Sequence, residues 1–151
     1  MLAVADCNNF FASCERSVDP RLKDVPIVVL SNNDGVIIAR SNEAKALGIK
    51  MGEPFFKVRE FCKKQRVRVF SGNFELYSRK SAEVMRVIAE YSPVMEVYSV
   101  DEAFMDISVI DGRGDLDAWG MQIRRAVMQA TGIPLSVGIA KTPGQQNSWV
   151  N

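Results

Sequence analysis

Two apolar strands that end at acidic residues constrain the fold of this chain more than any other feature. The first strand, Leu2–Ala5, is followed directly by Asp6 and then by a helix start. The second strand belongs to a predicted buried hairpin with mostly apolar arms, 95–100 and 103–107. The pair Asp101-Glu102 lies at the tip of this hairpin. Because apolar strands assemble into sheets and charged groups stay at strand ends, we expect these three carboxylates at one edge of a sheet.

Three carboxylates at strand ends predict a divalent-metal site. Oxygen ligands suit hard cations, and Mg²⁺ takes one or two carboxylates while it keeps waters and substrate phosphates in its other positions. Such a site acts on phosphates. An Asp-Glu pair taken alone is more often a solvated turn, and this alternative stands beside the metal site. The position of Asp6 after a second strand favours the metal site.

Composition limits the chemistry that is open to the chain. Its 151 residues are 47% hydrophobic, which suits one compact domain or a domain with a lobe. The absence of histidine excludes Ser-His-Asp triads, Cys-His pairs and zinc sites that contain histidine. Cys7, Cys14 and Cys62 have no Cys-x-x-Cys spacing, so we expect core thiols in a reducing compartment.

Charge is distributed unevenly along the chain although the formal net charge is only +1. Residues 57–68 contain six basic residues and one acid, and residues 101–117 contain six acids and one basic residue. The basic segment is either a solvated helix face or a binding surface for a phosphate backbone. No stretch approaches the ~20 apolar residues of a membrane span, and the apolar N-terminus is too short for a signal peptide. We therefore expect a soluble cytoplasmic protein.

The order of predicted elements indicates an α+β fold. A ferredoxin-like split βαβ sheet would comprise the first strand, a helix over 8–18, the hairpin, a helix over 115–131 and a strand over 135–140. A small α/β insertion over 19–71 would follow the first helix, and a long helix over 74–91 would precede the hairpin. In such a sheet the first strand and the hairpin lie side by side. Residues 141–151 have no periodicity and are expected to form a frayed or foreign end.

Five ordered motifs resemble the Y-family translesion DNA polymerases, and within them the branch of UmuC, the catalytic subunit of bacterial DNA polymerase V. The motifs are Ala5–Glu15, Val28–Gly35, Ala44–Gly48, Tyr98–Phe104 and Ser136–Ala140. The resemblance covers the chain to about Thr142. It implies a palm over 1–18 and 72–142, fingers over 19–71 and a divergent tail over 143–151.

The resemblance also implies a catalytic site. Asp6 and Asp101 match the metal-bridging aspartates, Glu102 matches the third catalytic carboxylate, and the carbonyl of Cys7 would be a further ligand. Two Mg²⁺ ions about 3.5 to 4 Å apart would activate the primer 3′-hydroxyl and stabilise the pyrophosphate leaving group. These ions are the expected cofactors.

Nucleotide contacts follow from the same resemblance. Backbone N–H groups of Asn8, Asn9, Phe10 and Phe11 would bind the triphosphate at a helix start. Phe11 would be the steric gate that excludes a 2′-hydroxyl, where UmuC-like proteins have tyrosine; a simple core phenylalanine is the alternative. Lys45 would contact the triphosphate; the alternative is an ordinary surface lysine on a helix. Many relatives carry a phosphate-contacting tyrosine where this chain has Asn42, and the role of Arg40 is open.

Two functions remain open at this level. The first is translesion synthesis as part of the SOS response to DNA damage, with a DNA primer-template and a deoxynucleotide as substrates. The second is an inactive fragment that binds metal, nucleotide or a partner only. A third hypothesis, a nucleotide cyclase, is disfavoured because its Gly-Gly-Asp/Glu-Glu-Phe hairpin is absent from Tyr98–Phe104.

The end of the chain bears on that choice. Because a palm helix, the thumb and the little finger would lie beyond it, we expect a C-terminally truncated chain with little or no activity. A UmuD′ dimer, RecA and the sliding clamp are the partners that the resemblance implies.

Overall fold

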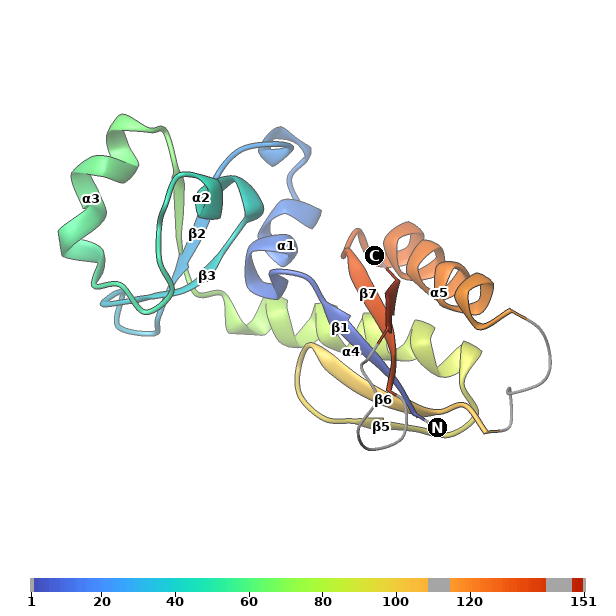
Figure 1. The fold of residues 1–151 in the computed structure, drawn as a ribbon. Coiled ribbons are helices and arrows are strands. Elements are labelled where there is room, and N and C mark those ends of the chain that lie inside the picture. The colour runs from blue at the N-terminus through green and yellow to red at the C-terminus, as the bar shows by residue number, and fades with distance from the viewer. Residues whose placement is uncertain (1, 109–114, 141–147, 151) are drawn as a thin grey trace. The chain divides into compact units, whose positions relative to one another are not determined.

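The computed structural model describes residues 2–108, 115–140 and 148–150. They belong to two compact units, Met1–Asn8 with Ser78–Asn151 and Asn9–Tyr77 (Figure 1). The chain therefore passes between the units twice, after Asn8 and within helix α4 (Phe74–Tyr91). The α+β class and the inserted second unit agree with the fold expected from the sequence.

The first unit is built on a five-stranded sheet. Its strand order is β5 (Met95–Val97), β6 (Glu102–Asp106), β1 (Leu2–Cys7), β7 (Leu135–Ala140) and β8 (Ser148–Val150), and all neighbouring pairs are antiparallel. Along the chain, β1, α4, β5, β6, α5 (Leu116–Thr131) and β7 follow the βαββαβ order of a ferredoxin-like sheet. The expected pairing of the first strand with the hairpin is confirmed, because β1 lies next to β6.

Alternating burial separates the two faces of this sheet. Along β1 and β6 every second residue is buried, and these residues share a core with Val84 and Ile88 of α4 and Ile123 and Val127 of α5. The remaining residues of β1 and β6 are only partly buried or exposed. Antiparallel sheets commonly leave one face open in this way, and the acidic residues lie on it.

The second unit has its own sheet and core. Its three strands have the order β3 (Ile37–Arg40), β2 (Ile27–Leu30) and β4 (Arg68–Ser71), with β4 parallel to β2. Four helical segments accompany the sheet: α1 (Phe10–Ser17), the 3₁₀ turn η1 (Pro20–Leu22), α2 (Asn42–Ala46) and α3 (Phe55–Lys64). The core of this unit includes a cluster of buried residues: Val28, Leu30, Ile37, Ala44, Ile49, Cys62 and Val67.

The boundaries of the inserted unit differ from the expected ones. The sequence placed the insertion after the first helix, but α1 itself and the first turn of α4 belong to the second unit. The helix that follows β1 in the ferredoxin-like order is therefore α4, which begins almost seventy residues later. The spacing of apolar residues predicts both helices, but it does not show which sheet each helix packs against.

Two edge strands also correct the sequence analysis. The hairpin was expected to be buried, but its first arm β5 lies at the sheet edge, where Val97 and Tyr98 are exposed. Within the segment expected to be a frayed or foreign end, residues 148–150 form a short strand that pairs with β7. Residues 141–147 and 151 lie outside the described part. Edge strands have one unpaired side, so their sequences carry a weaker burial signal.

Two further expectations can be compared with the structure. Cys7, Cys14 and Cys62 are all buried, as expected for core thiols. Within the described residues, none of the helices combines the length and the apolar character that crossing a membrane requires.

Candidate functional site

The first unit brings Asp6, Asp101 and Glu102 together. One carboxylate oxygen from each residue lies within 4.8 Å of the other two, and all three side chains are partly buried. Strand register explains this grouping, because Asp6 is directly opposite Glu102 in the β1–β6 ladder. Cross-strand partners point to the same face of a sheet, so both carboxylates project from its open face.

Backbone hydrogen bonds fix the third carboxylate beside the first two. The N–H of Cys7 donates to the carbonyl of Asp101 (2.8 Å), which extends the ladder one residue beyond β6. The Ser99 hydroxyl donates to Asp101 Oδ1 (2.9 Å), and the Glu102 carbonyl accepts from the N–H groups of Tyr98 and Ser99. The turn is therefore held closed, and one oxygen of Asp101 is oriented by a serine.

The electrostatic consequence is a raised proton affinity at Asp6. Burial raises the pKa of Asp6 to about 6, with smaller contributions in the same direction from the charges of Asp101 and Glu102. Like charges directly opposite each other in a sheet are destabilising. Three ionised carboxylates this close together destabilise the folded chain at neutral pH, and a bound cation would remove this destabilisation.

The donor set fits a hard divalent cation. All three side chains offer carboxylate oxygens, which suit Mg²⁺, Mn²⁺ or Ca²⁺. Cys7 was predicted to contribute its carbonyl, and its thiol is buried in the sheet core with 3% exposure. Any contribution from this residue would therefore come from the backbone.

Asn8 makes two hydrogen bonds within the first unit. Its backbone N–H donates to the carbonyl of Pro134 (2.9 Å), and its side-chain oxygen accepts from the Ser136 hydroxyl (2.8 Å). The anion-binding role of the backbone N–H groups of Asn8, Asn9, Phe10 and Phe11 stays a prediction.

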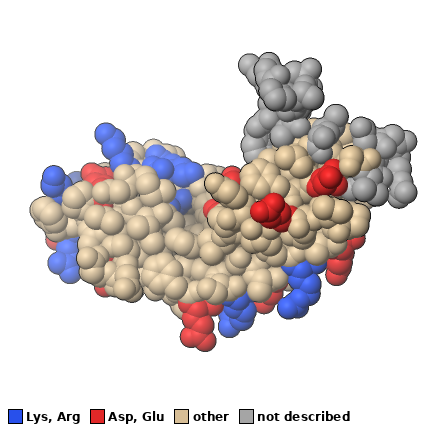
Figure 2. All heavy atoms as spheres, turned by 90° about the horizontal axis from the view of Figure 1, so that it is seen from below, with Lys and Arg blue, Asp and Glu red and all other residues tan. Residues whose placement is uncertain are grey.

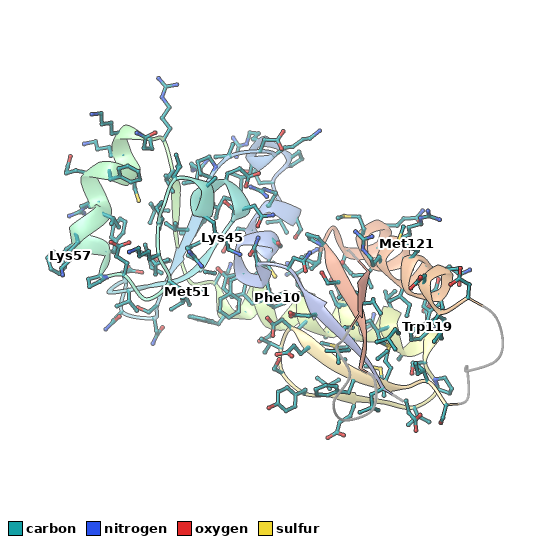
Figure 3. The ribbon with its side chains drawn as sticks, viewed as in Figure 1. Phe10, Lys45, Met51, Lys57, Trp119 and Met121 are labelled. Atoms are coloured by element: carbon teal, nitrogen blue, oxygen red, sulfur yellow. The ribbon has the colours of Figure 1, made fainter. Side chains whose placement is uncertain are left out.

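In the second unit, the start of α1 combines an uncapped helix end with a lysine. Asn9 is at the N-cap in a left-handed conformation (φ 48°), and its side chain does not cap the helix. It binds instead to α2: Asn9 Nδ2 donates to Asn42 Oδ1 (2.9 Å), and Lys45 Nζ donates to Asn9 Oδ1 (2.5 Å). Figure 3 shows Lys45 directed toward the start of α1, beside Phe10. The first N–H groups of a helix have no intrahelical acceptor, so this end attracts anions.

Phe11 lies in an aromatic cluster of the second unit. Its ring stacks on that of Tyr77, with centroids 4.5 Å apart and planes 17° apart, and the ring of Phe74 meets it edge-on. Phe10, by contrast, is buried. The structure thus separates two adjacent phenylalanines, one in the core and one on a partly open aromatic surface.

Arg40 and the basic segment take no part in these clusters. Arg40 Nη1 donates to the carbonyl of Ile49 (2.7 Å), which ties the arginine to its own unit. The six basic residues of 57–68 are all exposed on α3 and the residues after it, and Lys57 extends away from α3 in Figure 3. Figure 2 shows basic atoms on the surface of this unit. Exposure of this kind fits both interpretations of the basic segment.

Three contacts that hold the candidate residues were not predicted from the sequence. Ser99 orients Asp101, Asn42 binds Asn9, and Tyr77 supports Phe11. Ser99 carried a weak signal, because it precedes Asp101 by two residues in an alternating strand. The other two are 33 and 66 positions from their partners, so only the tertiary fold reveals them.

Comparisons with known proteins show the family to which the chain belongs. The sequence profile of the IMS, or impB/mucB/samB, family matches residues 5–145. Protein ImpB of Salmonella typhimurium is 48% identical over 99% of this chain and 36% of its own length. Protein UmuC of Salmonella typhimurium strain LT2 is 47% identical over 94% of this chain and 34% of its own. The chain therefore spans about a third of the length of these curated relatives.

Solved structures show the same fold. An insertion ternary complex of Dbh DNA polymerase superposes with a TM-score of 0.81 at 25% identity, over 93% of this chain and 42% of the polymerase. A Y-family DNA polymerase chimera built from Dbh and Dpo4 gives a TM-score of 0.81 at 24% identity, over 91% of this chain and 42% of its own. The alignment with ImpB covers 99% of this chain and so reaches into residues 141–151, which were expected to be a frayed or foreign end.

Proposed function

Because the chain belongs to the impB/mucB/samB family and has the fold of Y-family DNA polymerases, we propose that it forms the palm and fingers of a translesion DNA polymerase. The whole protein would add deoxynucleotides to a primer opposite damaged template bases. One observation carries the proposal: three carboxylates meet at the β1–β6 junction on the open face of the sheet.

Asp6, Asp101 and Glu102 would hold two Mg²⁺ ions in the first unit, with the Cys7 carbonyl as a further ligand. Divalent ions at such a site supply a Lewis acid for the attacking hydroxyl and the leaving phosphate. The chain's own contribution is orientation, because the β1–β6 register and the Ser99 hydrogen bond fix where the oxygens point.

Lys45, Asn9 and the uncapped N–H groups of Phe10 and Phe11 would bind the triphosphate in the second unit. The Lys45 ammonium group supplies charge, and the helix end supplies donors. Phe11 would act as the steric gate: its ring is partly exposed and stacked on Tyr77, and it would lie under a deoxyribose and exclude a 2′-hydroxyl.

Primer extension tests the proposed activity. The 151-residue chain is mixed with a primer-template, deoxynucleotides and Mg²⁺, beside Asp101→Ala and the control Asp106→Ala at the other end of β6. Incorporation that Asp101→Ala abolishes and Asp106→Ala retains would support an active polymerase. Extension that persists in Asp101→Ala would contradict the assigned site.

The alternative is a chain that binds metal and nucleotide without catalysis. In that case metal would bind at the triad but the primer would not be extended. Primer extension therefore separates the two possibilities. The partners predicted from the resemblance remain a UmuD′ dimer, RecA and the sliding clamp. A role in the SOS response is also predicted from the resemblance.

A further inference from the structure

A buried hydrogen bond joins two helices of the second unit behind the ring of Phe11. Tyr77, in the first turn of α4, donates from its hydroxyl to Glu15 Oε2 on α1, at 2.6 Å. Tyr77 is 2% exposed and Glu15 is 7% exposed. The two residues are 62 positions apart in the chain. Burial raises the pKa of the Glu15 carboxyl, and the hydrogen bond from Tyr77 acts in the opposite direction.

Placing a carboxyl group here is costly and needs a reason. Burying an ionisable group disfavours folding unless a hydrogen bond compensates, and a pair of apolar side chains would fill the same space without that cost. What a polar pair adds is a unique orientation, because a hydrogen bond fixes a direction that apolar packing leaves loose. The hydrogen bond to Glu15 therefore favours the side-chain orientation of Tyr77 that the structure shows.

The orientation of Tyr77 is transmitted to Phe11 by direct stacking. The two rings are nearly parallel, with centroids 4.5 Å apart. Phe74 closes the cluster by meeting both rings edge-on, at 5.9 Å from Phe11 and 5.6 Å from Tyr77. Phe74 is itself confined: a Cβ at Gly72 would lie 2.6 Å from its ring, so only glycine leaves this space. Phe11 is thus held on two sides by rings that cannot turn freely.

We infer that Glu15 and Tyr77 are positioning residues for sugar selection, which hold the Phe11 ring where it excludes a 2′-hydroxyl. The inference rests on the proposed function, in which Phe11 is the steric gate. A gate works only when its surface is fixed to a fraction of the size of a hydroxyl group, and supporting side chains provide that precision. Glu15 and Tyr77 would therefore affect the choice between ribonucleotides and deoxynucleotides without touching either.

Ring dynamics test the structural half of the inference. Aromatic NMR spectra of the chain report the flip rate of the Phe11 ring and its ring-current shifts. Tyr77→Phe keeps the stacked ring and removes only the hydroxyl, so faster Phe11 flipping and altered shifts are expected. Glu15→Leu should act in the same way, Glu15→Gln should act less because it retains an acceptor, and Tyr91→Phe on the same helix is the control. Unchanged Phe11 signals in Tyr77→Phe would overturn the inference.

Sugar selectivity tests the functional half. The readout is the ratio of the Kd for ATP to the Kd for dATP, measured for the chain with Mg²⁺. One well-packed group discriminates by roughly tenfold or more, so Tyr77→Phe should lower the ratio by about threefold to tenfold. Phe11→Leu should lower it further, and adding Tyr77→Phe to Phe11→Leu should then have no effect. Additive effects, or an unchanged ratio in Tyr77→Phe when Phe11→Leu lowers it, would overturn the inference and leave the proposed function intact.

A different failure identifies the proposed function as the error. If Phe11→Leu leaves the ratio unchanged, Phe11 is not the gate, and the role in sugar selection falls with it. If the unsubstituted chain binds neither nucleotide, the nucleotide site itself is contradicted. The NMR measurement distinguishes these cases. If Tyr77 positions Phe11, Tyr77→Phe should make the Phe11 ring flip faster whether or not Phe11 is the steric gate.

Discussion

At the scale of single residues, Asp6 shows how function and stability oppose each other. Its pKa is raised from 3.8 to about 6 in the folded chain, so folding takes up a proton between these values. The free energy of unfolding therefore falls as the pH rises from about 4 to above 6. Asp6→Asn removes this dependence. We expect the variant to melt at a higher temperature than the parent chain at pH 8 without metal, and the difference to shrink below pH 4.

Thermal unfolding in EDTA at several pH values measures this effect. Asp106→Asn is the control, because Asp106 lies on the same strand and its pKa is lowered by hydrogen bonds from Ser108. A melting temperature for Asp6→Asn that is lower than that of the parent at pH 8 would contradict the repulsion described for the triad.

Ser99 provides a second prediction at this scale. Its hydroxyl orients Asp101 Oδ1, and residues that orient metal ligands typically contribute 10–100-fold to metal affinity. Ser99→Ala should weaken Mn²⁺ binding by roughly tenfold. The matched control is Ser108→Ala, which removes a comparable serine–aspartate bond (2.6 Å) at the far end of β6. Equal Mn²⁺ affinity in Ser99→Ala and Ser108→Ala would show that the Ser99 bond has no such role.

At the scale of elements, Arg16 links α1 to three other parts of the second unit. Its guanidinium donates to the carbonyls of Leu22 and Val25 and forms an ion pair with Glu43 on α2 at 2.8 Å. Three charge-assisted bonds that converge on one partly buried group stabilise more than a surface pair does. Arg16→Met should lower the free energy of unfolding by about 2 kcal/mol.

The control for Arg16 is Arg21→Met. Arg21 is largely exposed and pairs with Asp19 two residues away, so its loss should destabilise the chain much less than the loss of Arg16. Urea unfolding followed by circular dichroism measures both variants. Equal effects of the two substitutions would mean that the Arg16 network does not stabilise the second unit.

Elements and their neighbours were predictable to different degrees. The hairpin and β1 followed from the apolar pattern, and their adjacency followed from the order of elements, because a split βαβ sheet places the first strand beside the hairpin. The packing partner of α1 did not follow, because an amphipathic helix specifies a buried face but not the surface that covers it. The exposure of β5 was missed for a related reason: an edge strand with apolar residues looks like a buried one in sequence.

The same reasoning applies to the candidate site. Local patterns predicted the carboxylates, and the family resemblance predicted the role of Phe11. The contacts of Phe11 with Tyr77 and of Asn9 with Asn42 join positions far apart in the chain, and no local pattern encodes such pairs. The hydrogen bond from the Asn8 N–H to the carbonyl of Pro134 is likewise a tertiary contact that the sequence does not reveal.

At the scale of the whole molecule, metal binding should be coupled to stability. A ligand that binds only the folded chain stabilises it by about 2.7 kcal/mol at a hundred times its Kd, and here it would also relieve the repulsion at Asp6. Mn²⁺ should therefore raise the melting temperature at pH 8, and EDTA should reverse the shift. Asp101→Asn should remove the response. A metal response of the same size in Asp101→Asn would locate the stabilising ion elsewhere.

Direct titration of Mn²⁺ into the chain tests the central claim, that Asp6, Asp101 and Glu102 form a divalent-metal site. Isothermal calorimetry or electron paramagnetic resonance at pH 8 measures the bound ion for the parent chain, Asp101→Asn and Asp106→Asn. The account predicts saturable binding in the parent and in Asp106→Asn, and loss of that binding in Asp101→Asn. Binding of equal affinity and stoichiometry in all three chains would contradict it.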